Sequence, residues 1–87
     1  FDPSAEIGVH LKNKNPYIYP NPATQWVRII SDYEIACVEL FHSSGKLIAT
    51  FNNTHTVDIS NISSGIYFIK ILIRDQEPII KKVIIVK

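Results

Sequence analysis

The 87-residue sequence contains one cysteine, no methionine and only three glycines. Because a single cysteine excludes an intrachain disulfide, the fold must depend on a hydrophobic core that several elements share. Cys37 lies within an apolar segment, where cysteine usually acts as a small buried hydrophobe, and no partner base for a catalytic thiol is apparent beside it. A chain that starts at Phe1 and lacks methionine is expected to be a piece of a longer product.

The sequence also lacks a strong charge imbalance and a long hydrophobic run. Nine basic and eight acidic residues give a formal net charge of +1, which offers no electrostatic attraction for nucleic acid or an anionic membrane. No apolar run approaches the length of a membrane-spanning helix, about 20 residues. Residues 1–16 do not have the pattern that is expected of a secretory signal peptide. We therefore expect no nucleic-acid partner and no membrane insertion.

Hydrophobic residues make up 46% of the chain, which is typical of a globular domain. Residues 1–16 are polar and irregular, with Pro3, Gly8 and Pro16 among several breakers. This stretch is expected to be a linker or the tail of a preceding domain, although weak alternation within residues 7–11 leaves a short strand open. Residues 17–87 are then expected to form one domain.

The densest apolar segments are residues 65–73 and 79–86, both rich in β-branched and aromatic side chains. Every second side chain from Tyr67 to Ile73 is apolar and is expected on the core face, whereas Lys70 lies on the opposite, partly wetted face. Residues 74–78 are charged and end in a proline, which is typical of an exposed turn. The pattern predicts a C-terminal β-hairpin against which the earlier strands pack.

Five shorter segments are also expected as strands: residues 17–19, 26–30, 35–41, 46–51 and 56–59. Val27 and Ile29 share one face of the second segment, and alternation in the third predicts Ala36, Val38 and Leu40 on the core face. No window shows the apolar spacing of a helix. The sequence therefore predicts an all-β fold, an immunoglobulin-like antiparallel β-sandwich of about seven strands.

Four residues in or beside the connections carry specific expectations. Prolines at positions 20 and 22 fix φ and favour extended neighbours, so residues 20–23 are expected to form a rigid corner before the first full strand. Gly45 lies in the turn 42–45 and is available for a positive φ. Asp58 is expected to accept a backbone N–H in the turn that follows it.

The sequence carries no recognisable catalytic or metal-binding constellation. The carboxylates mostly lie in turns or at strand ends, where solvated surface is the default: Asp32, Glu34, Asp58, Asp75 and Glu77. The histidines lie in three different segments without the paired spacing of a zinc site: His10, His42 and His55. No Gly-rich phosphate loop is present, and the pair Lys81–Lys82 is expected to be a solvated strand edge. We expect neither an enzyme nor a resident metal or cofactor.

The aromatic residues leave one binding hypothesis open. Four of them could form a sugar-binding platform on one sheet: Trp26, Tyr17, Tyr19 and Tyr33. Packing in the core or at a sheet edge is the alternative. The corresponding function is that of an immunoglobulin-like or fibronectin-like accessory module of a secreted enzyme, which would bind carbohydrate or act as a spacer.

Four blocks, taken in order, carry a resemblance to a known family: residues 19–23 (YPNPA), 40–48 (LFHSSGKLI), 57–67 (VDISNISSGIY) and 81–87 (KKVIIVK). In this order, and with a basic residue at the chain end, the sequence resembles the type A C-terminal sorting domain of the type IX (Por) secretion system of Bacteroidetes. The resemblance covers residues 17–87.

The resemblance implies an immunoglobulin-like β-sandwich that acts as a secretion signal and is not an enzyme. It also implies an N-terminal cargo domain in the parent chain, passage through the periplasm of a Bacteroidetes bacterium and recognition by the outer-membrane type IX translocon. A surface sortase-like protease would then remove the domain, with cleavage in the linker before Tyr17. The cargo would be secreted or held at the cell surface.

The resemblance also implies which residues form the sorting signal, namely Pro20, Asn21, Pro22, Gly45, Lys46, Gly65, Tyr67, Lys81, Lys82 and Lys87. The first three form the opening corner, the next two the hairpin turn, and the last three the terminal signal. The sequence departs from the family at Trp26, where a polar residue is usual, and at His42, where an acidic residue is usual.

A physical hypothesis for recognition follows from the position of the last strand. As an edge strand it is expected to dock a receptor by strand addition, with Lys87 and its carboxylate accessible at the sheet end. The strand edges, or Trp26, could also support a dimer.

Overall fold

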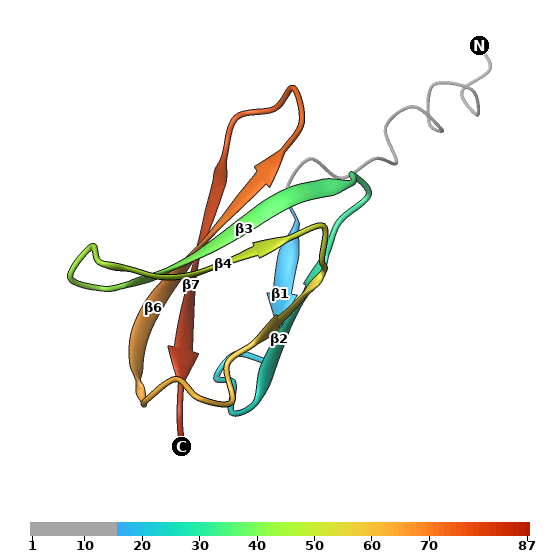
Figure 1. Cartoon of the computed structure of the whole chain (residues 1–87). Coiled ribbons are helices and arrows are strands. Elements are labelled where there is room, and N and C mark those ends of the chain that lie inside the picture. The colour runs from blue at the N-terminus through green and yellow to red at the C-terminus, as the bar shows by residue number, and fades with distance from the viewer. Residues whose placement is uncertain (1–15) are drawn as a thin grey trace, which may run out of the picture.

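The computed structural model describes residues 16–87, which form seven strands in two antiparallel sheets (Figure 1). The three-stranded sheet has the order β1-β2-β5, with β1 at Tyr17–Tyr19, β2 at Trp26–Ile30 and β5 at Thr56–Asp58. The four-stranded sheet has the order β4-β3-β6-β7, with β4 at Leu47–Asn52, β3 at Ile35–His42, β6 at Gly65–Ile73 and β7 at Ile79–Ile85. The predicted all-β sandwich of about seven strands is confirmed. The predicted linker, residues 1–16, lies outside the described residues except for Pro16.

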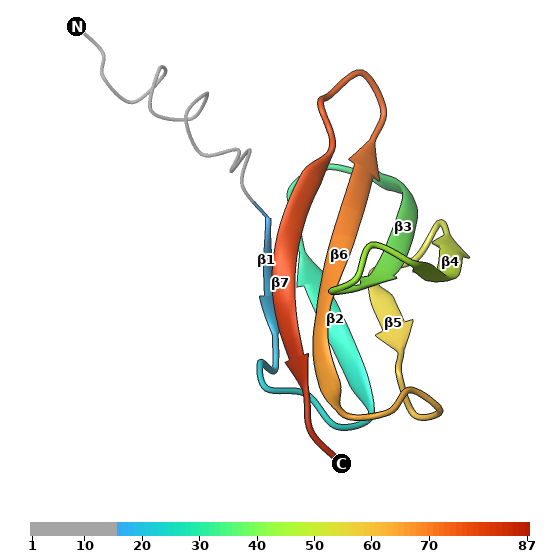
Figure 2. The ribbon, with the colours of Figure 1, turned by 90° about the vertical axis from the view of Figure 1, so that its left-hand side faces the viewer.

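The order of the strands arises because the chain changes sheet three times. It leaves the first sheet after β2, returns to it as β5, and ends with the hairpin β6–β7 in the second sheet (Figure 2). This alternation between two antiparallel sheets is the arrangement of immunoglobulin-like sandwiches. It places the first and last strands of the domain near each other, although they belong to different sheets.

The hairpin β6–β7 supplies the largest part of the core. Tyr67 is opposite Val83 and Ile71 is opposite Ile79, in uninterrupted antiparallel register. Alternate residues from Tyr67 to Ile73 are buried, as the sequence predicts. The charged turn between the strands is exposed, and Asp75 in this turn has a φ of +62°.

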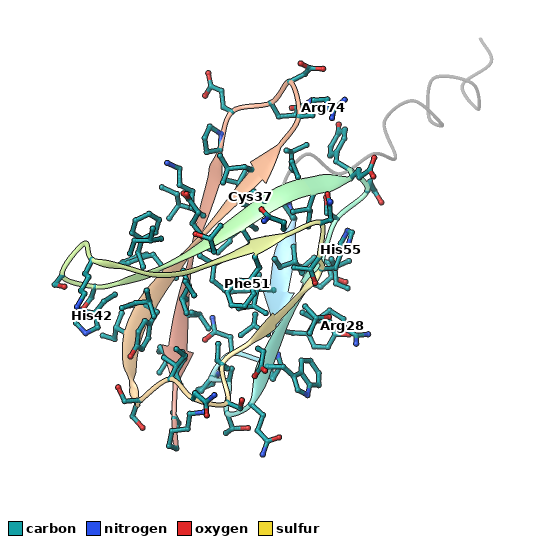
Figure 3. The ribbon with its side chains drawn as sticks, viewed as in Figure 1. Arg28, Cys37, His42, Phe51, His55 and Arg74 are labelled. Carbon is teal, nitrogen blue, oxygen red and sulfur yellow. The ribbon has the colours of Figure 1, made fainter. Side chains whose placement is uncertain are left out.

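The core lies between the sheets and consists of hydrophobic side chains alone within the described residues. The fully buried side chains of β2 include Val27 and Ile29, as predicted, and Val57 on β5 joins them. Phe51 of β4 packs against this cluster from the second sheet (Figure 3). At about 25 cal/mol per Å² of apolar surface, burial of these side chains provides the main driving force for folding.

One prediction about the core face of β3 is wrong. Ala36 is exposed, whereas Ile35, Val38 and Leu40 are buried. The register against β6 shifts between Ile35 and Cys37, so an extra residue interrupts the alternation at the start of the strand. Cys37 therefore lies opposite Leu72 on the outer side of the sheet and is partly exposed instead of buried.

The turn between β3 and β4 depends on Gly45 and on His42. Gly45 has a φ of +98°, and its N–H donates to the carbonyl of His42 at 2.8 Å. The Nδ1 atom of His42 accepts the N–H of Ser44 at 3.0 Å, which is the hydrogen bond that a carboxylate two residues earlier makes in an Asx turn. The imidazole also packs edge-on against the ring of Tyr67, with centroids 5.3 Å apart. His42 can therefore replace an acidic residue at this position without loss of the turn.

Replacing Gly45 with Ala should destabilise the domain by about 1–2 kcal/mol, the usual cost of a left-handed backbone for a residue with a Cβ. A Cβ at Gly45 would meet no heavy atom within 4 Å, so the cost arises from the backbone conformation and not from a clash. Urea unfolding curves measure the effect. Gly45→Asn is the matched variant and should lose less stability than Gly45→Ala, because Asn tolerates positive φ better than Ala. Equal losses in both variants would contradict this explanation.

Candidate functional site

The candidate site lies where the β1–β2 connection runs beside the last strand, close to the C-terminus (Figure 2). We call this region the C-terminal corner. It comprises residues 20–24 of the connection, residues 58–60 and 64 of the loop between β5 and β6, and residues 82–87 at the chain end. Half of the residues predicted for the sorting signal belong to it, namely Pro20, Asn21, Pro22, Lys82 and Lys87.

The connection contains Pro20 and Pro22, and the peptide bonds before both prolines are cis. It leads to Ala23, which is completely buried and forms an isolated parallel bridge with Ile85. The N–H of Ala23 donates to the carbonyl of Ile84 at 2.8 Å, and its carbonyl accepts the N–H of Val86 at 2.9 Å. The predicted corner is thus a short piece of backbone paired with the outer edge of β7.

The side chain of Asn21 extends this pairing by two further hydrogen bonds. Its Nδ2 donates to the carbonyl of Lys82 at 3.0 Å, and its Oδ1 accepts the N–H of Ile84 at 3.0 Å. A side-chain amide has the same donor and acceptor as a peptide group, so Asn21 acts here as one more unit of strand backbone. The edge of β7 is paired by this segment from the Lys82 carbonyl to the Val86 N–H.

The structure therefore changes the hypothesis of docking by strand addition. β7 is an edge strand of its sheet, as predicted. Over its C-terminal half, however, Asn21 and Ala23 already occupy the outward backbone groups. A receptor strand could pair there only after it had displaced this segment, because each backbone group bonds one partner strand at a time.

Lys87 is fixed by contacts with two other segments of the chain. Its Nζ donates to the carbonyls of Thr24, Ile59 and Ser60, the latter two at 2.7 and 3.3 Å. These three bonds use all three donors of the ammonium group. The N–H of Lys87 donates to Ser64 Oγ at 2.9 Å. The side chain thus connects the β1–β2 connection to the loop that follows β5.

Asp58 places a negative charge beside this ammonium group. Its Oδ1 accepts the N–H of Ser60 at 2.9 Å, as the sequence predicts. The hydrogen bonds from the backbone and the hydroxyl of Ser60 hold the pKa of the Asp58 carboxyl below its ordinary value of 3.8. The positive charge of Lys87 lowers the pKa further, as a smaller contribution.

Gly65 and Tyr67 form the base of the C-terminal corner at the start of β6. They lie opposite Ile85 and Val83 in the register with the last strand. The hydroxyl of Tyr67 donates to the carbonyl of Ser63 at 2.9 Å, which fixes the loop that carries Ser64. A Cβ at position 65 would lie 3.3 Å from the Tyr67 ring, so the glycine makes room for the buried tyrosine.

Of the remaining predicted residues, only Lys82 belongs to this corner. Gly45 and Lys46 belong to the β3–β4 turn, which projects away from the C-terminus in Figure 1. Lys81 and Lys82 point to opposite sides of β7, because neighbours on a strand alternate. Lys82 is exposed on the outer face, whereas Lys81 is partly buried on the side of Val83.

Sequence reasoning missed Thr24, Ile59 and Ser60, although they hold the terminal ammonium group. All three contribute backbone carbonyls, which any residue type offers, so the sequence contains no signal for them. Within residues 16–87 no group of three or more His, Cys, Asp or Glu side chains could hold a metal ion. A helix long and apolar enough to span a membrane is also not found in this part of the chain.

Replacing Asn21 with Ala should open the C-terminal half of the β7 edge. The substitution removes two hydrogen bonds, each worth about 1 kcal/mol, and leaves the Ile84 N–H without its partner. Amide hydrogen exchange should therefore accelerate at Ile84, and unfolding in urea should occur at a lower concentration. Asn61→Ala, at an exposed position in the β5–β6 loop, is the matched control. Unchanged protection of Ile84 in Asn21→Ala would contradict the pairing described here.

The contribution of Asp58 to stability should depend on pH. Because its pKa is lowered in the folded state, the ionised carboxylate stabilises the fold above the pKa of the unfolded chain. This stabilisation is lost as the pH falls through the lowered pKa. The stability difference between the wild type and Asp58→Asn should therefore be full at pH 7 and vanish only in acid below the lowered pKa. Urea unfolding at several pH values measures it, and a pH-independent difference would contradict the assignment.

Comparison with known protein families gives a match over most of the chain. The sequence matches the family described as secretion system C-terminal sorting domain over residues 17–86. Comparisons with curated proteins and with solved structures gave no significant match. The matched residues include all seven strands and nearly all of the C-terminal corner. The chain belongs to the family of C-terminal sorting domains of the type IX (Por) secretion system.

Proposed function

We propose that residues 17–87 direct an attached N-terminal cargo domain through the type IX translocon, and that the C-terminal corner is the surface that the translocon recognises. One observation supports recognition of the C-terminal corner by the translocon. Segments of the signal that are more than 60 residues apart in sequence are joined by direct hydrogen bonds around the last strand. The signal is then a folded surface and not a linear peptide.

The chemistry of the corner indicates the kind of receptor surface that would bind it. Pro20, Pro22 and Lys82 are exposed, and Ile84 and Val86 leave apolar surface open beside them. A receptor site of matching chemistry would offer apolar side chains together with a carboxylate for the exposed lysine. Docking on such a surface requires no displacement of Asn21 and Ala23.

The outer face of β6 and β7 extends this surface away from the corner. Ile80 is 62% exposed, and Ile66 and Ile84 also leave large apolar areas in solvent. Lys70 and Phe68 lie on the same outer face of β6, because they alternate with the buried Ile69. An exposed patch of isoleucines bordered by lysines is typical of a protein-binding surface. This supports contact with a protein partner, in keeping with a tag that the secretion machinery recognises.

We propose further that, after export, a surface sortase-like protease removes the domain by cutting before Tyr17. The cargo would then be secreted or retained at the surface of a Bacteroidetes bacterium after passage through the periplasm. The domain has the role of a protease substrate and not of an enzyme. In support, the family that matches the chain is described as a sorting domain.

The export test uses a fluorescent reporter with an N-terminal export signal followed by residues 1–87. We expect delivery to the surface or the medium in a Bacteroidetes strain with an intact type IX translocon, and retention in the periplasm without it. Deletion of Val86 and Lys87 should reduce delivery to the level of the translocon-deficient strain. The mass of any released reporter locates the cleavage site.

Two point variants separate recognition from folding. Lys87→Ala removes the ammonium group that joins the loops, whereas Lys82→Ala removes an exposed charge and leaves the backbone pairing intact. Both should impair export, but only Lys87→Ala should also lower the stability in urea. Arg74→Ala, in the exposed turn between β6 and β7, is the matched control and should be exported normally. Normal export of both Lys82→Ala and Lys87→Ala would refute recognition of the corner.

A further inference from the structure

The outer face of the three-stranded sheet carries a group of exposed aromatic side chains. Tyr17 and Tyr19 alternate with the inward Ile18 on β1, and Trp26 alternates with the inward Val27 on β2. Tyr17 is 55% exposed, and Tyr19 and Trp26 are each 41% exposed. Tyr33, by contrast, packs against the core and does not belong to this face. Three of the four aromatic residues suggested by the sequence as a platform therefore share one surface.

Two ring contacts hold Trp26 in place. The ring of Tyr19 meets it edge-on, with centroids 6.1 Å apart and planes at 80°. The guanidinium carbon of Arg28 lies 5.5 Å from the centroid of the Trp26 ring, within the range of a cation–π contact. Such contacts restrict the rotamers of the indole, so less conformational entropy is lost when a ligand stacks on it.

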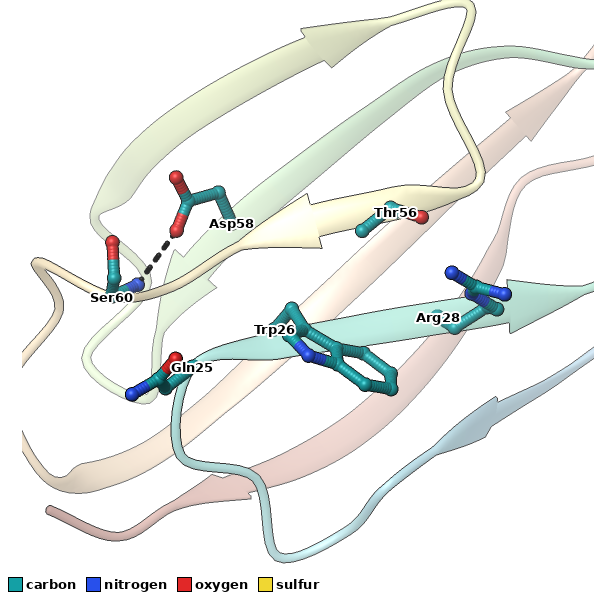
Figure 4. Close-up of a pocket in the computed structure, with 6 residues that line it drawn as sticks. All are labelled: Gln25, Trp26, Arg28, Thr56, Asp58 and Ser60. Atoms are coloured by element: carbon teal, nitrogen blue, oxygen red, sulfur yellow. Dashed lines mark hydrogen bonds between the residues drawn. The ribbon is translucent and has the colours of Figure 1, made fainter.

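Beside Trp26 the surface is hollowed between β2 and β5 (Figure 4). The hollow has a volume of about 420 Å³ and is lined by Gln25, Trp26, Arg28, Thr56, Asp58 and Ser60. Its size falls within the usual range of small-molecule sites, which is roughly 300–1,000 Å³. One wall is the indole, and every other lining side chain ends in a polar group.

The polar groups complement one another in hydrogen-bonding capacity. Arg28 can only donate, the ionised Asp58 can only accept, and Gln25 can do both. Asp58 uses one oxygen for the Ser60 N–H, and a carboxylate has further acceptor sites. The single positive and single negative charge balance, so the hollow favours neither an anionic nor a cationic ligand.

We propose that this hollow binds one residue of a neutral glycan. A pyranose ring has an apolar face of C–H groups, which stacks on an indole, and a rim of hydroxyls that both donate and accept. The exposed ring of Trp26 fits the first feature, and Arg28, Asp58 and Gln25 fit the second. A purely apolar ligand would leave these polar groups unpaired, which is unfavourable.

The hollow shares only Asp58 and Ser60 with the C-terminal corner. Asp58 and Ser60 border the hollow and also lie beside the ammonium group of Lys87. Trp26 and Arg28 lie on β2 and belong to the hollow alone. Variants of these two residues therefore test glycan binding without changing the C-terminal corner.

Trp26 is the only tryptophan of the chain, so its fluorescence reports directly on the site. Residues 1–87 would be titrated with neutral oligosaccharides of glucose, mannose, galactose or xylose. We expect a saturable change in emission with at least one of them. Absence of a saturable change with all of them would overturn the proposal. A shift that depends on protein concentration without sugar would overturn it as well, because it would identify the Trp26 face as a self-association surface.

Affinity electrophoresis tests the contributions of Trp26 and Arg28 to binding. The gels contain a polysaccharide of the sugar that changes the Trp26 emission. Loss of one stacking contact should weaken binding about tenfold in Trp26→Ala, and Arg28→Ala should weaken it also. Phe68→Ala, an aromatic position on the outer side of the other sheet, is the matched control and should migrate as the wild type. Equal retardation of Trp26→Ala and the wild type would overturn the proposal. Trp26→Ala should still be exported, so failure of glycan binding and failure of sorting are distinguishable.

Discussion

The pairing of Asn21 and Ala23 with the outer edge of β7 is the constraint on which the C-terminal corner depends. An uncovered edge strand exposes a row of backbone donors and acceptors that can pair with other chains. Four hydrogen bonds from the β1–β2 connection satisfy this row between the Lys82 carbonyl and the Val86 N–H. The β1–β2 connection, near the start of the domain, thus pairs with the outer edge of the last strand, β7.

This closure links formation of the C-terminal corner to completion of the fold. Its partners are more than 60 residues apart, so their contacts form only when the intervening strands have brought both segments together. The contact between the Lys87 ammonium group and the carbonyls of Thr24 and Ile59 has the same requirement. A receptor that binds this surface would therefore discriminate folded from unfolded domains. A receptor of the last few residues as an extended peptide would not make this distinction.

Much of this fold could be predicted from the sequence, because alternation in β2 and β6 is unbroken and the turns are marked by glycine, proline and charge. The prediction failed at Ala36, where a bulge shifts the alternation without any glycine or proline to announce it. Resemblance to the family predicted a set of signal residues near the ends of the domain. It could not indicate that Asn21 substitutes for a peptide group, since this depends on the three-dimensional proximity of β7. The role of His42 as an acceptor in the turn also emerged only from its geometry.

The outer faces of the two sheets expose different kinds of side chain. This difference would allow one small domain to bind two different partners. The four-stranded sheet presents isoleucines with lysines, which suits a protein surface. The three-stranded sheet presents Trp26 beside balanced polar groups, which suits a sugar ring. Because the sheets face outward in opposite directions, the two surfaces need not compete for one ligand. The loop with Asp58 and Ser60 borders both the sugar site and the Lys87 contact, so any coupling between glycan binding and recognition must pass through this loop.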